Sequence, residues 1–129
     1  MKLLHLSDLH IGKRVNNFSM IEDQKYILKE ILEIIDREKP DGVMIAGDIY
    51  DRSIPSEEAV DLFDWFLVNL VRRETEIFII SGNHDSAERL SFGHKIMDAC
   101  NVHISPVYEK DICSFRLHEG KTDEVCIYL

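Results

Sequence analysis

Hydrophobic residues follow two alternating patterns along the first hundred residues of the chain. Short, mainly apolar runs, typical of strands buried on both faces, occupy residues 2–7, 42–46 and 76–80. Between them, in residues 20–38 and 57–73, apolar side chains recur at helical spacing. This alternation of strands and helices predicts an α/β fold with a mostly parallel sheet flanked by helices.

The expected helices begin at residues that favour helix capping. Ser19 and Glu22 have the spacing of a capping box, so we expect Ser19 to cap the first helix. Ser56 precedes two acidic residues, which suit the positive end of a helix, and is expected to cap the second. Ser86 is expected to cap a third helix that reaches about residue 99.

The second helix has one apolar face, which we expect to pack in the core: Ala59, Phe63, Phe66 and Leu70. Trp65 and Val68 fall among the polar residues of the other face. An exposed tryptophan there indicates a contact surface. A tryptophan covered by a neighbouring loop or helix is an equally good interpretation.

The pattern changes after residue 100, where short strands at 102–104, 112–117 and 124–129 are joined by polar turns. The last of them ends the chain on an apolar strand. We therefore expect residues 1–129 to be a partial domain of a larger fold.

Composition restricts the possible functions. The chain has 129 residues, of which 45% are hydrophobic, as in an ordinary single domain. No stretch approaches the roughly 18 apolar residues of a membrane span, so no membrane partner is expected. The three widely spaced cysteines indicate reduced thiols in a cytoplasmic protein. The formal charge of −9 argues against a nucleic-acid binder, unless several carboxylates hold cations.

Polar motifs follow each of the three expected parallel strands: D-x-H at 8–10, G-D-x-x-D at 47–51 and G-N-H-D at 82–85. The carboxyl ends of parallel strands meet at one edge, so these carboxylate, imidazole and amide groups are expected to cluster there. Crowded carboxylates must be neutralised, paired with arginine or bound to cations. A single Asp after a strand is often only a turn former, but three such motifs at successive strands favour a metal site for manganese, iron or zinc.

These motifs, in this order, resemble those of the calcineurin-like metallophosphoesterase superfamily. The stretches DLHIGKR, GDIYD and GNHDSAERL are similar to its SbcD-type nucleases. The resemblance implies an α/β/β/α sandwich that binds two divalent ions, usually Mn²⁺. It further implies four metal ligands, of which Asp48 bridges both ions: Asp8, His10, Asp48 and Asn83.

The resemblance also implies a catalytic pair. His84 would protonate the leaving oxygen or stabilise the transition state. Asp51 would orient His84 and keep it protonated, although an ion pair of Asp51 with Arg52 or Arg89 is the alternative. Asp85 is expected to brace the turn or cap the third helix.

The chain departs from the family pattern after these motifs. The family completes both metal sites with a later histidine and a G-H-x-H pair, whereas Gly93-His94 is followed here by Lys95 and Ile96. We therefore expect an incomplete second metal site, an incomplete second sheet of the sandwich and a domain truncated before the later histidine motifs.

The function implied by the resemblance is metal-dependent hydrolysis of DNA, together with an SbcC-type ATPase, in DNA end processing and repair. The expected partners are DNA, that ATPase and a second copy of the chain, paired through helices around Trp65. A phosphatase or cyclic-nucleotide phosphodiesterase is one alternative, although Ser53 interrupts the phosphatase motif G-D-x-x-D-R-G. A catalytically inactive dimerisation fragment is the other.

Overall fold

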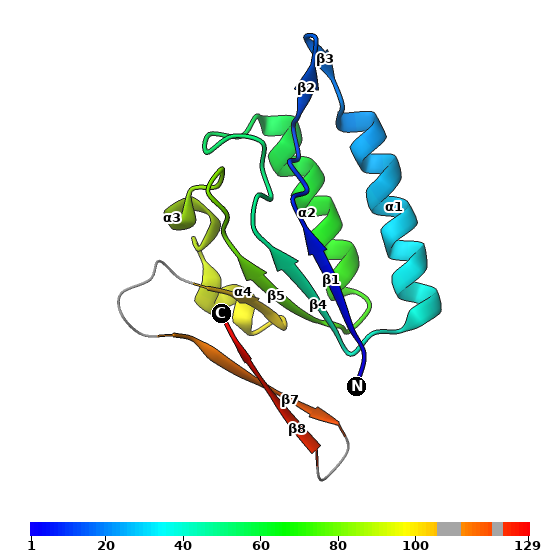
Figure 1. Cartoon of the computed structure of the whole chain (residues 1–129), viewed down its shortest axis with the longest axis vertical. Helices are drawn as coiled ribbons and strands as arrows, with labels where there is room; N and C mark the ends of the chain where they lie inside the picture. Colours follow the sequence, from blue (N-terminus) through cyan, green and yellow to red (C-terminus); the bar gives the residue numbers. More distant parts are fainter. Residues whose placement is uncertain (106–111, 120–122) are drawn as a thin grey trace.

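The computed structural model describes residues 1–105, 112–119 and 123–129 and contains a four-stranded parallel sheet (Figure 1). The strand order is β1-β4-β5-β6. The strands are β1 (Leu3–Ser7), β4 (Gly42–Ala46), β5 (Glu76–Ile80) and β6 (Val102–Ile104). Each neighbouring pair is parallel, which confirms the predicted sheet and leaves β1 at one edge.

Two long helices, α1 (Ile21–Glu38) and α2 (Glu57–Val71), cover one face of this sheet (Figure 1). The main core lies between them and the strands, where Phe66, Leu70 and Ile79 are fully buried. The apolar face predicted for α2 is therefore confirmed. The short helices α3 (Ala87–Leu90) and α4 (His94–Asp98) follow β5, and Leu90 and Met97 also pack against this core.

The other face of the sheet carries an antiparallel hairpin of β7 (Ser114–Glu119) and β8 (Asp123–Tyr128). Phe78 of β5 packs there with Leu117 and Ile127 in a second, smaller core. The His103 ring contacts the rings of Phe78 and Phe115, with centroid distances of 5.1 Å and 4.4 Å, and these two rings lie 5.8 Å apart, so the three contact one another. Helices, parallel sheet and hairpin thus form successive layers, as expected for the N-terminal part of an α/β/β/α sandwich.

The expected capping box at the first helix is wrong. Ser19 belongs instead to β3 (Phe18–Ser19), which pairs with β2 (Arg14–Val15) in a small hairpin. Asn16 and Asn17 form its turn with positive φ angles of 48° and 66°. Asparagine tolerates this left-handed conformation, and two such residues suit a tight hairpin turn. Helix α1 consequently begins after Met20, without a side-chain cap.

The cap of the second helix is confirmed, because Ser56 Oγ accepts a hydrogen bond of 3.4 Å from the Ala59 amide. The prediction of one continuous third helix is wrong. Gly93 adopts a left-handed conformation, φ 74°, at the start of α4 and separates it from α3. Ser86 stands at the N-cap of α3, but its hydroxyl bonds the Glu88 carboxylate and no backbone amide.

Trp65 is partly buried against the main core, so the interpretation of a covered tryptophan holds. Val68, the other apolar residue of that face, is 40% exposed, and further exposed apolar side chains lie outside it. Phe92 and Ile96, between and on the short helices, are 83% and 77% exposed, and Val60 of α2 is 43% exposed. No helix in the described ranges combines the length and the hydrophobicity that crossing a membrane requires.

Candidate metal centre

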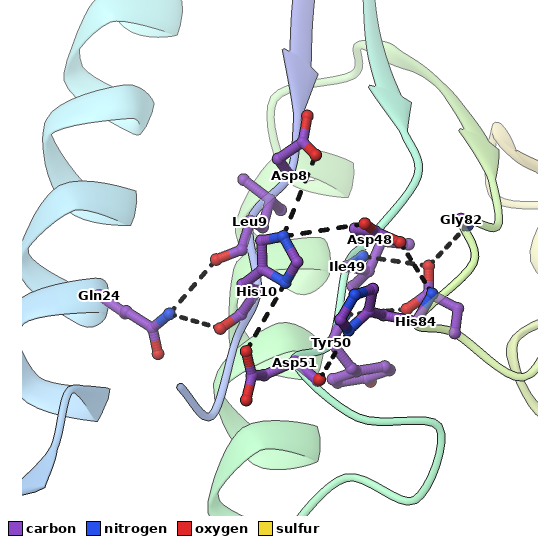
Figure 2. A network of polar contacts seen from close by, with 11 residues as sticks. Asp8, Leu9, His10, Gln24, Asp48, Ile49, Tyr50, Asp51, Gly82 and His84 are labelled. Atoms are coloured by element: carbon purple, nitrogen blue, oxygen red, sulfur yellow. Dashed lines mark hydrogen bonds and ion pairs between the residues drawn. The ribbon is translucent and has the colours of Figure 1, made fainter. Parts of the chain in front are cut away.

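The loops that follow β1 and β4 run side by side beyond the ends of the strands. The amides of Asp8, His10 and Ile11 donate hydrogen bonds of 3.2, 2.9 and 2.8 Å to the carbonyls of residues 47, 48 and 49. The two loops therefore stay paired past the sheet edge through these bonds and one isolated parallel bridge, between Ile11 and Tyr50. This register brings the D-x-H motif against the G-D-x-x-D motif (Figure 2).

Asp8, His10 and Asp48 converge on one point (Figure 2). His10 Nε2 lies 4.0 Å from Asp8 Oδ1 and 3.8 Å from Asp48 Oδ2. All three ligand atoms lie within 4.8 Å of one another. Metal–ligand bonds are about 2.1 Å long, so a single ion could reach these three atoms with little movement. Two carboxylates and an imidazole form a donor set that fits manganese, iron or zinc.

The three residues of this cluster share an unusual backbone conformation. Asp8, His10 and Asp48 have φ angles of 54°, 44° and 46°, in the left-handed region. Each such residue costs on the order of 1 kcal/mol or more and persists only where its surroundings impose it. Backbone strain of this kind concentrates at functional sites, which supports a ligand role for the cluster.

Gly82 allows the loop after β5 to approach Asp48 closely. A Cβ atom at Gly82 would lie 2.2 Å from both the amide nitrogen and Oδ1 of Asp48. The same Oδ1 accepts a hydrogen bond of 2.9 Å from the His84 amide. One oxygen of Asp48 is thus held by the third loop, and the other faces His10.

Asp85 joins the second and third loops. Its carboxylate accepts hydrogen bonds from the amides of Ile49, at 3.1 Å, and Tyr50, at 2.9 Å. A third bond of 2.9 Å comes from the amide of Gly82 in its own loop. The expectation that Asp85 braces the turn is therefore confirmed.

Asp51 and His84 are in contact, but not as the sequence suggested. His84 Nδ1 lies 3.0 Å from the backbone carbonyl of Asp51. The Asp51 carboxylate points instead to His10, with Oδ1 3.7 Å from Nδ1. A carbonyl only accepts hydrogen bonds, so His84 Nδ1 carries a proton and Nε2 remains available to a substrate.

The Asp51 contact also bears on His10. His10 Nδ1 is buried and makes no hydrogen bond with the described residues, so this carboxylate is its nearest charged neighbour. The alternative ion pairs of Asp51 with Arg52 or Arg89 do not occur among the described residues. The rings of His10 and His84 meet edge to face, with centroids 5.1 Å apart.

Asn83 lies on the third loop between Gly82 and His84 and is exposed. Its role as a ligand of a second ion stays a prediction. Tyr50, beside Asp85, is partly buried, and this burial with the nearby charges of Asp85 and Asp64 raises the pKa of its phenol to about 12. The phenol is therefore neutral at ordinary pH.

Gln24 of α1 was not anticipated from the sequence. Its side chain donates to the carbonyls of Leu9 and His10 in the first loop (Figure 2). It also accepts a bond from the amide of Gly12. No motif marks this residue, because its partners are backbone atoms that any sequence would offer.

The chain is similar to known proteins. Residues 1–122 match the family model of the calcineurin-like phosphoesterases. The chain is 42% identical over 105 residues to the SbcD subunit of the nuclease SbcCD from Staphylococcus epidermidis, covering 81% of this chain and 28% of that protein. It is 40% identical over 106 residues, with the same coverage, to the SbcD subunit from Staphylococcus saprophyticus. The chain thus spans little more than a quarter of the length of these curated relatives.

Proposed function

The chain belongs to the calcineurin-like phosphoesterase family, and we propose that it forms the N-terminal part of a metal-dependent DNA nuclease. The observation that carries this proposal is the cluster of Asp8, His10 and Asp48 beside His84 at the carboxyl edge of the sheet. The two nuclease subunits with 40–42% identity favour DNA as the substrate.

Asp8, His10 and Asp48 would hold one divalent ion, and Asp48 and Asn83 a second. Bound ions of this kind polarise a phosphoryl oxygen and activate water at neutral pH. Mn²⁺ is the proposed metal because the family resemblance implies it; the mixed oxygen and nitrogen donors suit manganese, iron or zinc better than calcium. The second site would have two of the proposed ligands, Asp48 and Asn83.

His84 is proposed as the catalytic residue that meets the substrate. Its Nδ1 is engaged by the Asp51 carbonyl, which orients the ring and leaves Nε2 directed to other partners. When charged, Nε2 would donate a proton or hydrogen bond to the leaving oxygen of the phosphodiester. Asp51 would act in two ways, through its carbonyl on His84 and through its carboxylate on His10.

The proposed partners are DNA, an SbcC-type ATPase and a second copy of the chain. The relatives are named as subunits of a complex, which supports a partner protein for this chain as well. The exposed apolar side chains Phe92, Ile96 and Val60 are a better candidate for self-association than the partly buried Trp65. Sedimentation of the wild-type chain and of Phe92→Glu tests this self-association. A strictly monomeric wild type would exclude a second copy of the chain as a partner. We place the protein in the cytoplasm, because its three cysteines are odd in number, widely spaced and contain no C-x-x-C pair.

Calorimetric titration with Mn²⁺ tests the metal centre directly in this chain. We expect binding by the wild type and its loss in Asp48→Asn, which keeps the shape of the side chain but removes its charge. Binding that is equal in the two proteins would exclude the proposed ligand set.

The substrate class needs a second experiment. In a protein extended to the length of the relatives, we expect Mn²⁺-dependent cleavage of single-stranded DNA to exceed hydrolysis of a phosphomonoester. Preference for the monoester would favour the phosphatase alternative, and preference for a cyclic nucleotide the phosphodiesterase alternative. Inactivity of the extended protein towards all three, with the dimer intact, would leave the inactive dimerisation module.

A further inference from the structure

We propose that Gln24 is a positioning residue, which fixes the loop that carries the ligands Asp8 and His10. This inference rests on the proposed function, because it assigns a role to a helix residue at the same metal centre.

Gln24 occupies a side of the loop that has no strand beside it. β1 is the edge strand of the described sheet, so the loop after it pairs only with the loop after β4. On the open side, Gln24 Oε1 accepts a bond of 3.0 Å from the Gly12 amide. Gln24 Nε2 donates bonds of 2.7 Å to the His10 carbonyl and 3.3 Å to the Leu9 carbonyl (Figure 2). The carboxamide thus substitutes for the missing backbone neighbour.

The pattern of donors and acceptors on the loop requires an amide. The loop presents one N–H group and two carbonyls, so the side chain must accept at one atom and donate at another. A carboxylate of the same length would only accept, and an ammonium group would only donate. Gln24 is partly buried, which reduces the competition of water for these bonds.

The strain in the loop explains why it needs such a clamp. Every second residue of this loop has a left-handed backbone, because Asp8, His10 and Gly12 have φ angles of 54°, 44° and 90°. Gln24 bonds the main chain at His10 and Gly12 without bonding the imidazole, so it acts on the ligand through the backbone. Loss of these bonds would let the loop relax and move His10 away from Asp48.

The test compares Gln24→Met and Gln24→Glu with Leu32→Ala, a change in the buried face of the same helix two turns away. We expect both Gln24 variants to weaken Mn²⁺ binding in calorimetry by roughly 10-fold or more, the usual effect of losing a residue that orients a ligand. Gln24→Glu is the more specific variant. It keeps the size of the side chain and the bond from the Gly12 amide, and it loses only the donor to the two carbonyls. Leu32→Ala should lower the melting temperature and leave the affinity within about 2-fold. Wild-type affinity in Gln24→Met, or an equal loss in Leu32→Ala, would overturn the proposal.

Amide hydrogen exchange of the metal-free chain separates this proposal from the proposed function. We expect the Gly12 amide to lose its protection in Gln24→Met, while the amides of the α2 core keep theirs. If the wild type binds no Mn²⁺, the proposed function fails, and exchange at Gly12 alone decides the positioning role. Unchanged protection at Gly12 would then overturn it.

Discussion

Replacement of Gly82 by alanine should damage the metal centre without adding a polar or charged group. The added methyl carbon would lie 2.2 Å from the Asp48 amide nitrogen and 2.2 Å from its Oδ1, where real contacts stay above 3.0 Å. Rotation of the Asp48 side chain relieves only the second clash, so the backbones of the two loops must separate. That movement breaks the 2.9 Å bond from the His84 amide to Asp48 and carries Oδ2 away from His10.

Two quantities follow from this displacement. Overpacking at a rigid contact costs about 1–3 kcal/mol of stability. Misplacing Asp48 should weaken Mn²⁺ binding roughly 10- to 100-fold, as for other changes that disturb the orientation of a metal ligand. Thermal unfolding followed by circular dichroism measures the first quantity, and isothermal titration calorimetry measures the second.

Gly93→Ala is a matched control with the same added atom. Nothing lies within 4 Å of a Cβ at Gly93, but its φ of 74° strains any side chain. A left-handed alanine costs roughly 1–2 kcal/mol, so this control should lose a similar amount of stability. Its Mn²⁺ affinity should stay that of the wild type. Normal Mn²⁺ binding by Gly82→Ala, or an equal loss of affinity in both variants, would refute the proposed dependence of the metal centre on the close approach of Gly82 to Asp48.

Three further predictions concern stability. Ser56→Ala should lower the free energy of unfolding by about 0.5–1 kcal/mol in urea titrations, because α2 loses its cap; no change would mean that water replaces the 3.4 Å bond. Asp85→Asn should cost about 1–3 kcal/mol and also weaken Mn²⁺ binding, since one of the two carboxylate oxygens becomes a donor facing backbone amides; a neutral effect on both would contradict its bracing role. Tyr50 holds its proton more tightly in the folded chain, where its pKa is about 12, than in the unfolded chain, where it is about 10. Its contribution is therefore complete below about pH 10 and falls as the pH rises towards about 12, so the wild type should lose more stability than Tyr50→Phe between about pH 9 and pH 11.5. Parallel losses in the two proteins would show that the phenol titrates normally.

The strands and the capped second helix were predictable because their signals are local. The apolar runs of β4 and β5 lie between polar or glycine-containing segments, and the structure reproduces both sets of bounds. The hairpin of β2 and β3 was missed because two-residue strands contain no periodic pattern. Its signal was the Asn16-Asn17 pair, whose tolerance of positive φ favours a hairpin turn and competes with the capping box at Ser19.

The gathering of Asp8, His10 and Asp48 was predictable because parallel strands fix the register of the loops that follow them. The contacts between the loops were harder to predict from the sequence. The pairing of Asp51 with His84 was expected between side chains, and the structure makes it through a carbonyl. Sequence motifs identify side chains, whereas every residue offers the same main-chain atoms, so contacts of this kind depend on the three-dimensional path of the chain.

Main-chain contacts of this kind also explain how a strained centre is maintained. Left-handed backbone at Asp8, His10 and Asp48 disfavours the site by a few kcal/mol in total, at about 1 kcal/mol or more for each residue. Gln24 and Asp85 oppose this cost with three hydrogen bonds each, which at about 1 kcal/mol per bond are of comparable size. All six bonds go to the main chain of the ligand loops, and none uses a proposed ligand atom. The proposed ligands are thus oriented before any ion arrives, and of their carboxylate and imidazole atoms at the cluster only Asp48 Oδ1 is already bonded, to the His84 amide. A centre organised in this way loses affinity when the residues around it change, even though its ligands remain in place.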